Sequence, residues 1–218
     1  MKRLCILVST LIMVLGLSVS AQGALVDMKD GTIYDTATQL SWLKDANYAM
    51  TSGYDADGRM TWADANAWAA SLNNGGGFAG LTGWRLPTAD ESCNGGTGGS
   101  NCTNGEMGHL YYTELGNVAG GPLTNTGPFI NVQTYSYWSC TVYAPNPSQA
   151  WVLDFTNGTQ GADGMTNARN AWAVRPGARL QSTGNATSVP TMTEWGMIIF
   201  IVLAGIGSVY YLRRQRRA

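Results

Sequence analysis

Charged residues are scarce in this sequence, and basic residues most of all. Of the 218 residues, 12% are charged, about half of the ~25% that a soluble globular chain usually carries. Between Gln22 and Ser188 there are 7 basic and 13 acidic side chains, which gives a formal charge of −6. Nucleic acids and heparin-like polyanions need a concentrated basic face. We therefore expect neither as a partner.

Histidine and cysteine are scarce as well. The chain has one histidine, His109, and four cysteines. A thiol nucleophile at Cys140, activated by His109, is the sharpest enzyme hypothesis that these residues allow. A lone cysteine and a lone histidine without an activating third group are usually structural, so we predict that the protein is not an enzyme.

Glycine and tryptophan, in contrast, are abundant, with 28 and 8 residues. Glycine at nearly twice its usual ~7% indicates a loop-rich domain rather than a helical bundle. Seven of the tryptophans lie between Trp42 and Trp172. Most of them are expected in the core, since each can bury about 200 Å².

The first 21 residues have the order of a secretory signal peptide. A basic start at residues 2–3 is followed by an apolar run over 4–17 and by small residues up to Ala21. Cleavage after Ala21 makes Gln22 the first residue of the mature chain, whereas cleavage after Ala24 makes it Leu25. Export places the mature chain in a compartment that permits disulfides.

An uncharged run of 18 residues, 195–212, lies near the other end. At about 1.5 Å per residue it reaches ~27 Å, which is enough to cross the hydrocarbon core of a bilayer. A basic cluster follows at once, made of Arg213, Arg214, Arg216 and Arg217. Because basic flanks stay in the cytoplasm, we predict a transmembrane helix with residue 218 inside and the preceding domain outside.

The residues just before this run, together with its first two, form a recognisable motif. It reads Val189, Pro190, Thr191, Met192, Thr193, Glu194, Trp195 and Gly196. Together with the apolar run and the arginines, it closely resembles the IPTL-CTERM class of bacterial C-terminal sorting signals, with Val189 and Met192 in place of Ile and Leu. The resemblance implies an inner-membrane-anchored precursor that an exosortase-type transpeptidase processes and delivers to the surface of a Gram-negative-type bacterium, or outside it. A plain single-pass anchor that is not processed is the alternative.

Residues 25–176 are predicted to form one domain, which a polar linker, 177–188, separates from residues 189–218. Short apolar stretches at 32–34 and 40–42 predict a hairpin. Thr61 and Asp64 have the spacing of a capping box, and the apolar residues up to Leu72 recur at helical spacing. Thr88 and Glu91 have a similar spacing and predict the start of a second helix, which is interrupted and resumes from Met107.

The last third of this region indicates strands. Residues 135–141 are rich in aromatics, residues 150–155 alternate, and Asn157-Gly158 has the composition of a hairpin turn ahead of a strand at 170–175. We therefore predict an α+β fold with an antiparallel sheet and two helices.

Several strings in this region are similar to the C-terminal domain family of the Legionella collagen-like adhesin, Lcl. They run in order from YDTATQLSWLKDANY to NAWAVRP and cover almost all of residues 30–176. The most specific markers are Trp84, Arg85, Leu86 and Pro87, followed by Tyr137, Trp138 and Ser139. The resemblance implies a C-type-lectin-like fold and extracellular binding or adhesion, with the marker residues in structural roles and no catalytic residues to transfer.

The cysteines and three aspartates of this region allow predictions of disulfide pairing and of metal binding. Cys93 and Cys102 are the favoured disulfide, because the eight residues between them are small and pliant. A pairing of Cys140 with either of them stays open. No cofactor is predicted, although Asp55, Asp57 and Asp64 form part of a calcium-loop pattern; the alternative is a turn ahead of the first helix.

These features together predict an exported surface protein whose lectin-like domain binds a carbohydrate or an extracellular matrix component. The alternative is a structural component of the extracellular matrix or biofilm that self-associates without a specific ligand. The membrane is contacted through the C-terminal helix, and the processing transpeptidase is the second partner expected.

Overall fold

The computed structural model of the protein describes residues 23–177. The chain divides after Arg179 into two units. The predicted signal peptide, most of the linker, the sorting motif, the apolar run 195–212 and the arginine cluster lie outside the described residues. Within residues 23–177, no helix has the length and the apolar character needed to cross a membrane.

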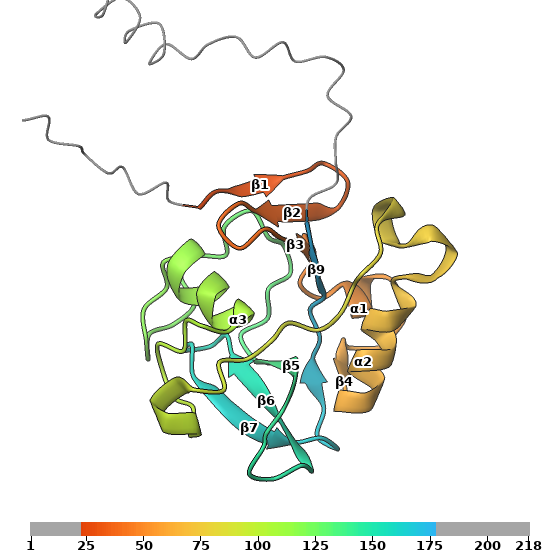
Figure 1. Ribbon diagram of the computed structural model, residues 1–218. Coiled ribbons are helices and arrows are strands. Elements are labelled where there is room, and N and C mark those ends of the chain that lie inside the picture. The colour runs from red at the N-terminus through yellow and green to blue at the C-terminus, as the bar shows by residue number, and fades with distance from the viewer. Residues whose placement is uncertain (1–22, 178–218) are drawn as a thin grey trace, which may run out of the picture. The chain divides into compact units, whose positions relative to one another are not determined.

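The first sheet joins the two ends of the described chain. Its strands have the order β1-β2-β3-β9, and every neighbouring pair is antiparallel (Figure 1). The predicted hairpin is confirmed as β2 and β3, in which Ile33 is opposite Trp42. The bounds are β1 Leu25–Asp27, β2 Thr32–Asp35, β3 Leu40–Leu43 and β9 Val174–Pro176. Because the last strand pairs with the third, residues 23–177 close a hydrophobic core of their own.

The second sheet has the order β4-β8-β5-β6-β7. Its pairs are antiparallel except β5 and β8, which meet in parallel at Tyr137 and Asn170. The turn at Asn157-Gly158 is confirmed, since it connects β6 to β7, with Gly158 at a φ of 81°. The bounds are β4 Arg59–Met60, β5 Ser136–Val142, β6 Gln149–Asp154, β7 Gln160–Gly164 and β8 Arg169–Asn170. The α+β class is therefore confirmed, but with two sheets where the sequence predicted one.

The first predicted helix is confirmed as α2, Trp62–Ser71. The Thr61 side chain accepts a hydrogen bond from the backbone N–H of Asp64 and donates one to its carboxylate. Ala65, Trp68 and Ala69 are buried on its inner face. In Figure 1 this helix, with α1, flanks the sheets on the side opposite α3.

The helix start predicted at Thr88 is wrong. The backbone N–H of Thr88 donates to the carboxylate of Glu106, and the Thr88 carbonyl accepts from the Glu106 backbone N–H. These groups are therefore held by a residue 18 positions away and cannot begin a helix. Helical structure starts instead at Glu106, as α3, Glu106–Gly108, which continues into the π-helical η4, His109–Glu114.

The shorter helices are α1 Tyr48–Thr51, η1 Asn74–Gly76, η2 Phe78–Gly80 and η3 Cys93–Gly96.

Tryptophan forms the centre of the core, as the composition predicts. Five of its side chains are fully buried, namely Trp42, Trp68, Trp138, Trp151 and Trp172. The indole N–H groups also connect elements that are distant in the sequence: Trp138 donates to the carbonyl of Met60, and Trp172 to that of Leu43. A buried indole N–H needs such an acceptor, so these bonds hold β5 to β4 within the second sheet, and the segment between β8 and β9 to the end of β3.

The favoured disulfide, between Cys93 and Cys102, is confirmed, with a Cα–Cα distance of 5.3 Å. Cys140 is a free, half-buried cysteine. The disulfide loop is also attached to the second sheet, because Gly99 and Gln160 exchange two backbone hydrogen bonds of 2.8 Å. The disulfide loop is therefore an ordered part of the domain.

Candidate functional site

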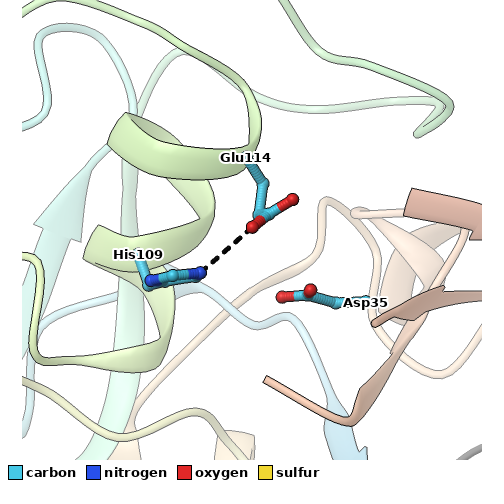
Figure 2. A group of neighbouring side chains, drawn as sticks. All are labelled: Asp35, His109 and Glu114. Carbon is cyan, nitrogen blue, oxygen red and sulfur yellow. Dashed lines mark hydrogen bonds and ion pairs between the residues drawn. The ribbon is translucent and has the colours of Figure 1, made fainter. Parts of the chain in front are cut away.

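Three potential metal ligands converge between the first sheet and the α3–η4 helix. Asp35 lies at the end of β2, and His109 and Glu114 lie on η4 (Figure 2). One ligand atom from each lies within 4.8 Å of the other two. Among residues 23–177 no other group of three His, Cys, Asp or Glu side chains is this close. We call Asp35, His109 and Glu114 the carboxylate–histidine cluster.

The chain that follows β2 fixes the carboxylate of Asp35. Its Oδ1 accepts hydrogen bonds from the backbone N–H groups of Ala37 (2.9 Å) and Thr38 (3.3 Å). Its Oδ2 accepts one from the Thr38 hydroxyl. This Asx-turn arrangement holds the carboxylate in place, and Asp35 is only 1% exposed.

The π-helical geometry of η4 brings His109 and Glu114 together. Residues five apart point to different sides of an α-helix, which has 3.6 residues per turn. In η4 the backbone N–H of Leu115 instead donates to the carbonyl of Leu110, five residues earlier. This wider turn places Nε2 of His109 3.1 Å from Oε1 of Glu114. Short π-helical segments are frequent at functional sites.

The cluster is enclosed but not sealed. The side chain of Glu114 is 3% exposed and that of His109 is 25% exposed. Gly23 closes it on one side, because a Cβ at that position would lie 2.7 Å from Oε1 of Glu114. The imidazole edge is therefore the accessible side of the cluster.

The residues of the calcium-loop pattern do not form such a group. Oδ1 of Asp55 accepts from the backbone N–H groups of Asp57 and Gly58. Asp57 pairs with the Arg59 guanidinium, which lowers the pKa of the Asp57 carboxyl. Asp64 contacts Thr61 at the start of α2. The geometry of Asp55, Asp57 and Asp64 is thus that of a turn ahead of a capped helix.

The cysteine and histidine of the enzyme hypothesis are not joined. His109 bonds to Glu114, and the backbone N–H of Cys140 donates to the carbonyl of Pro87. Burial raises the pKa of the Cys140 thiol, with a smaller, opposing effect of Arg85. A raised pKa disfavours the thiolate that a nucleophilic cysteine requires.

Every basic side chain in the described part of the chain already has a partner. Five form ion pairs with aspartate or glutamate, and Arg175 donates to the carbonyls of Thr82 and Gly177. The five are Lys29, Lys44, Arg59, Arg85 and Arg169. A polyanion would have to compete with these contacts for the basic side chains.

A separate, largely apolar pocket of about 150 Å³ lies beside β3 and α1. Tyr48 and Phe78 form part of its wall and pack edge to face, with ring centroids 5.0 Å apart. The polar lining comes from Lys44 and Asp45. Ile130, which also lines it, is 49% exposed. Such a mixture of an aromatic wall and a few polar groups is typical of small-ligand sites.

The sequence markers occupy structural positions. Arg85 makes a bidentate ion pair with Glu106, at 2.7 and 2.6 Å, and this pair anchors the start of α3. Leu86 and Trp138 are fully buried, and the Tyr137 hydroxyl accepts from the backbone N–H of Gln133. The remaining markers act through the backbone or through packing: Trp84 is buried, the Pro87 carbonyl accepts from Cys140, and the Ser139 carbonyl accepts from the Trp62 indole.

The fold and its sites define a disulfide-bonded α+β domain with a tryptophan core, a carboxylate–histidine cluster and a small surface pocket. Residues 31–175 match the family described as the Lcl C-terminal domain. The chain belongs to this family. The matched region runs from the start of the β2–β3 hairpin to β9, and so covers the second sheet, the first sheet without β1, and the disulfide. A comparison with curated proteins found no match.

Proposed function

We propose that the protein is an exported binding or adhesion protein, and that its domain recognises an extracellular carbohydrate or matrix component without catalysing a reaction. The observation that carries the proposal is the match to the Lcl C-terminal domain, an adhesin-like family, over the whole folded core. The disulfide is consistent with an oxidising compartment.

The fold that we propose is C-type-lectin-like. Two features favour it: the pairing of the terminal strand β9 with β3, and a second sheet that carries long loops. In this arrangement the first sheet joins the chain ends, and the ligand is bound by loops held on a rigid scaffold.

The pocket beside α1 is the place that we assign to the ligand. A sugar ring presents an apolar face and an edge of hydroxyl groups, and the pocket offers Tyr48 and Phe78 for the first. Its polar lining is Lys44 and Asp45, which also contact Asp27 and Thr51 respectively, so hydroxyl groups would share these contacts. Its volume of about 150 Å³ limits it to one small group, such as a terminal sugar unit.

Delivery to the surface belongs to the same proposal. We propose that residues 1–21 direct export, that the helix 195–212 anchors the precursor in the inner membrane, and that an exosortase-type enzyme then processes residues 189–218. Mass spectrometry of the mature protein tests this step. A mature chain that still ends in Ala218 would rule out processing and leave a simple membrane anchor.

Ligand recognition is tested on a fragment of residues 22–180, which contains both sheets and their core. We expect sugar-specific signals on a glycan array, which are lost when the exposed Ile130 of the pocket is changed to serine. Val118→Ser is the matched control, because Val118 is 64% exposed and does not line the pocket. Light scattering on the same fragment separates the alternative: oligomers without any glycan signal would favour a self-associating matrix component.

A further inference from the structure

We propose that Asp35, His109 and Glu114 bind a single divalent cation of the zinc class. The proposal rests on the convergence of three ligand atoms within 4.8 Å, from two elements that lie 74 or more residues apart in the sequence. Figure 2 shows the carboxylates of Asp35 and Glu114 and the ring of His109 facing a common space.

Charge is the first argument for a cation. Asp35 is 1% exposed and the Glu114 side chain 3%, so two carboxylates are removed from water beside each other. In residues 23–177 no lysine or arginine pairs with either of them. Buried charges are normally paired or coordinate a metal, because an uncompensated one is costly. A divalent cation neutralises both.

Free coordination capacity on both carboxylates is the second argument. Within the described chain, Oε1 of Glu114 contacts His109, and Oε2 makes no hydrogen bond. Oε2 is not among the buried polar atoms that lack a partner, so it is accessible to a further ligand. Asp35 uses both oxygens for the turn after β2, but a carboxylate has about four lone-pair sites and keeps capacity for a metal.

The donor set selects the type of metal. Calcium and magnesium take oxygen ligands, whereas an imidazole nitrogen suits zinc and similar transition-metal ions. One nitrogen and two carboxylates are the ligand number of zinc sites that keep a fourth position open. That position falls on the side of His109, whose side chain is 25% exposed.

The geometry requires only a small adjustment. Ligand atoms around a tetrahedral zinc ion at about 2.0–2.2 Å lie about 3.3–3.6 Å from one another. His109 and Glu114 are already at 3.1 Å, so the change needed is an approach of Asp35 toward the pair. The bound ion would join the end of β2 to η4, and would thus connect the first sheet to the helix that follows the disulfide loop.

The single histidine of the chain makes the test direct. The mature protein, without a histidine tag and uniformly labelled with ¹⁵N, is stripped with EDTA and titrated with ZnCl₂. We expect one equivalent of zinc to bind and the ring nitrogen signals of His109 to shift. His109→Gln and Glu114→Gln should each weaken zinc binding by at least about tenfold. Glu91→Gln, at an exposed carboxylate outside the cluster, should leave it unchanged.

Two results would overturn the proposal. Ring nitrogen signals that stay unchanged in the unsubstituted protein at excess zinc would show that the cluster is no metal site, and this measurement does not depend on whether any variant folds. Equal zinc affinity in Glu114→Gln and the unsubstituted protein would place the ion elsewhere. CaCl₂ in place of ZnCl₂ should leave the His109 signals unchanged, and the same shift with calcium would refute the assignment to the zinc class.

Discussion

Reduction of the Cys93–Cys102 disulfide should lower the free energy of unfolding by a limited, calculable amount. The two cysteines are 9 residues apart in the sequence. For a loop of this length the chain-entropy expression gives about 2.7 kcal/mol at 25 °C. The loss arises mainly in the unfolded chain, which gains conformations when the loop is opened.

The folded domain should survive this change, because the loop has other attachments. Gly99 and Gln160 exchange two backbone hydrogen bonds. The Gln160 side chain accepts from the backbone N–H of Asp90, at 3.0 Å, and donates to its carbonyl, at 2.8 Å. We therefore expect a less stable protein with the same native structure.

Urea unfolding of the 22–180 fragment, followed by tryptophan fluorescence, measures the effect in oxidised and reduced samples. The unfolding midpoint should fall, and both samples should unfold in one cooperative transition. The Cys93→Ala, Cys102→Ala double variant is the control for buried thiols, and reducing agent should not alter it further. A loss below about 0.5 kcal/mol, or a reduced sample with no cooperative transition, would refute the reasoning from loop closure and from the Gln160 contacts.

Three further predictions concern other contacts. Glu106→Gln removes the carboxylate that pairs with the partly exposed Arg85. The free energy of unfolding, measured with urea, should fall by about 1–3 kcal/mol, which lies between the values for surface and for buried ion pairs. An unchanged unfolding midpoint would contradict this. Because burial raises its pKa, the Cys140 thiol should react with iodoacetamide at pH 8 more slowly in the folded protein than in urea, and the rate should rise with pH; equal rates would contradict the effect. A fragment that begins at Leu25 should be less stable in urea than one that begins at Gln22, because it lacks the two hydrogen bonds between Ala24 and Thr36; equal midpoints would contradict this.

Sequence spacing correctly predicted those elements whose stabilising contacts join residues a few positions apart. The Thr61 and Asp64 spacing forms α2 because both partners belong to the same helical turn. The spacing of Thr88 and Glu91 failed, because Glu106 takes the backbone N–H of Thr88. Strand β7 was missed since its residues, QGADG, have no apolar alternation, and contacts distant in the sequence order them, namely pairing with β6 and the backbone bonds of Gln160 with Gly99.

No local sequence spacing predicts the carboxylate–histidine cluster. Asp35 and His109 are 74 positions apart, and a spacing of five between His109 and Glu114 points away from a shared face in an α-helix. In the sequence, His109 stands out only as a partner for Cys140. The turn residues after Asp35 and the acid near the only histidine were visible, but only the fold brings them together.

The position of β9 decides how the domain responds to tension. Any pull exerted through the chain beyond Gly177 reaches the domain first at this strand, whose three residues pair with Leu40, Ser41 and Trp42. Backbone hydrogen bonds between Arg85 and Val174 hold the same strand to a second segment. When the load runs along the strand, these bonds share it and must break together, so the strand resists peeling. If the protein is displayed at a cell surface, as we propose, the domain would thereby stay folded under fluid shear while its attachment point is strained.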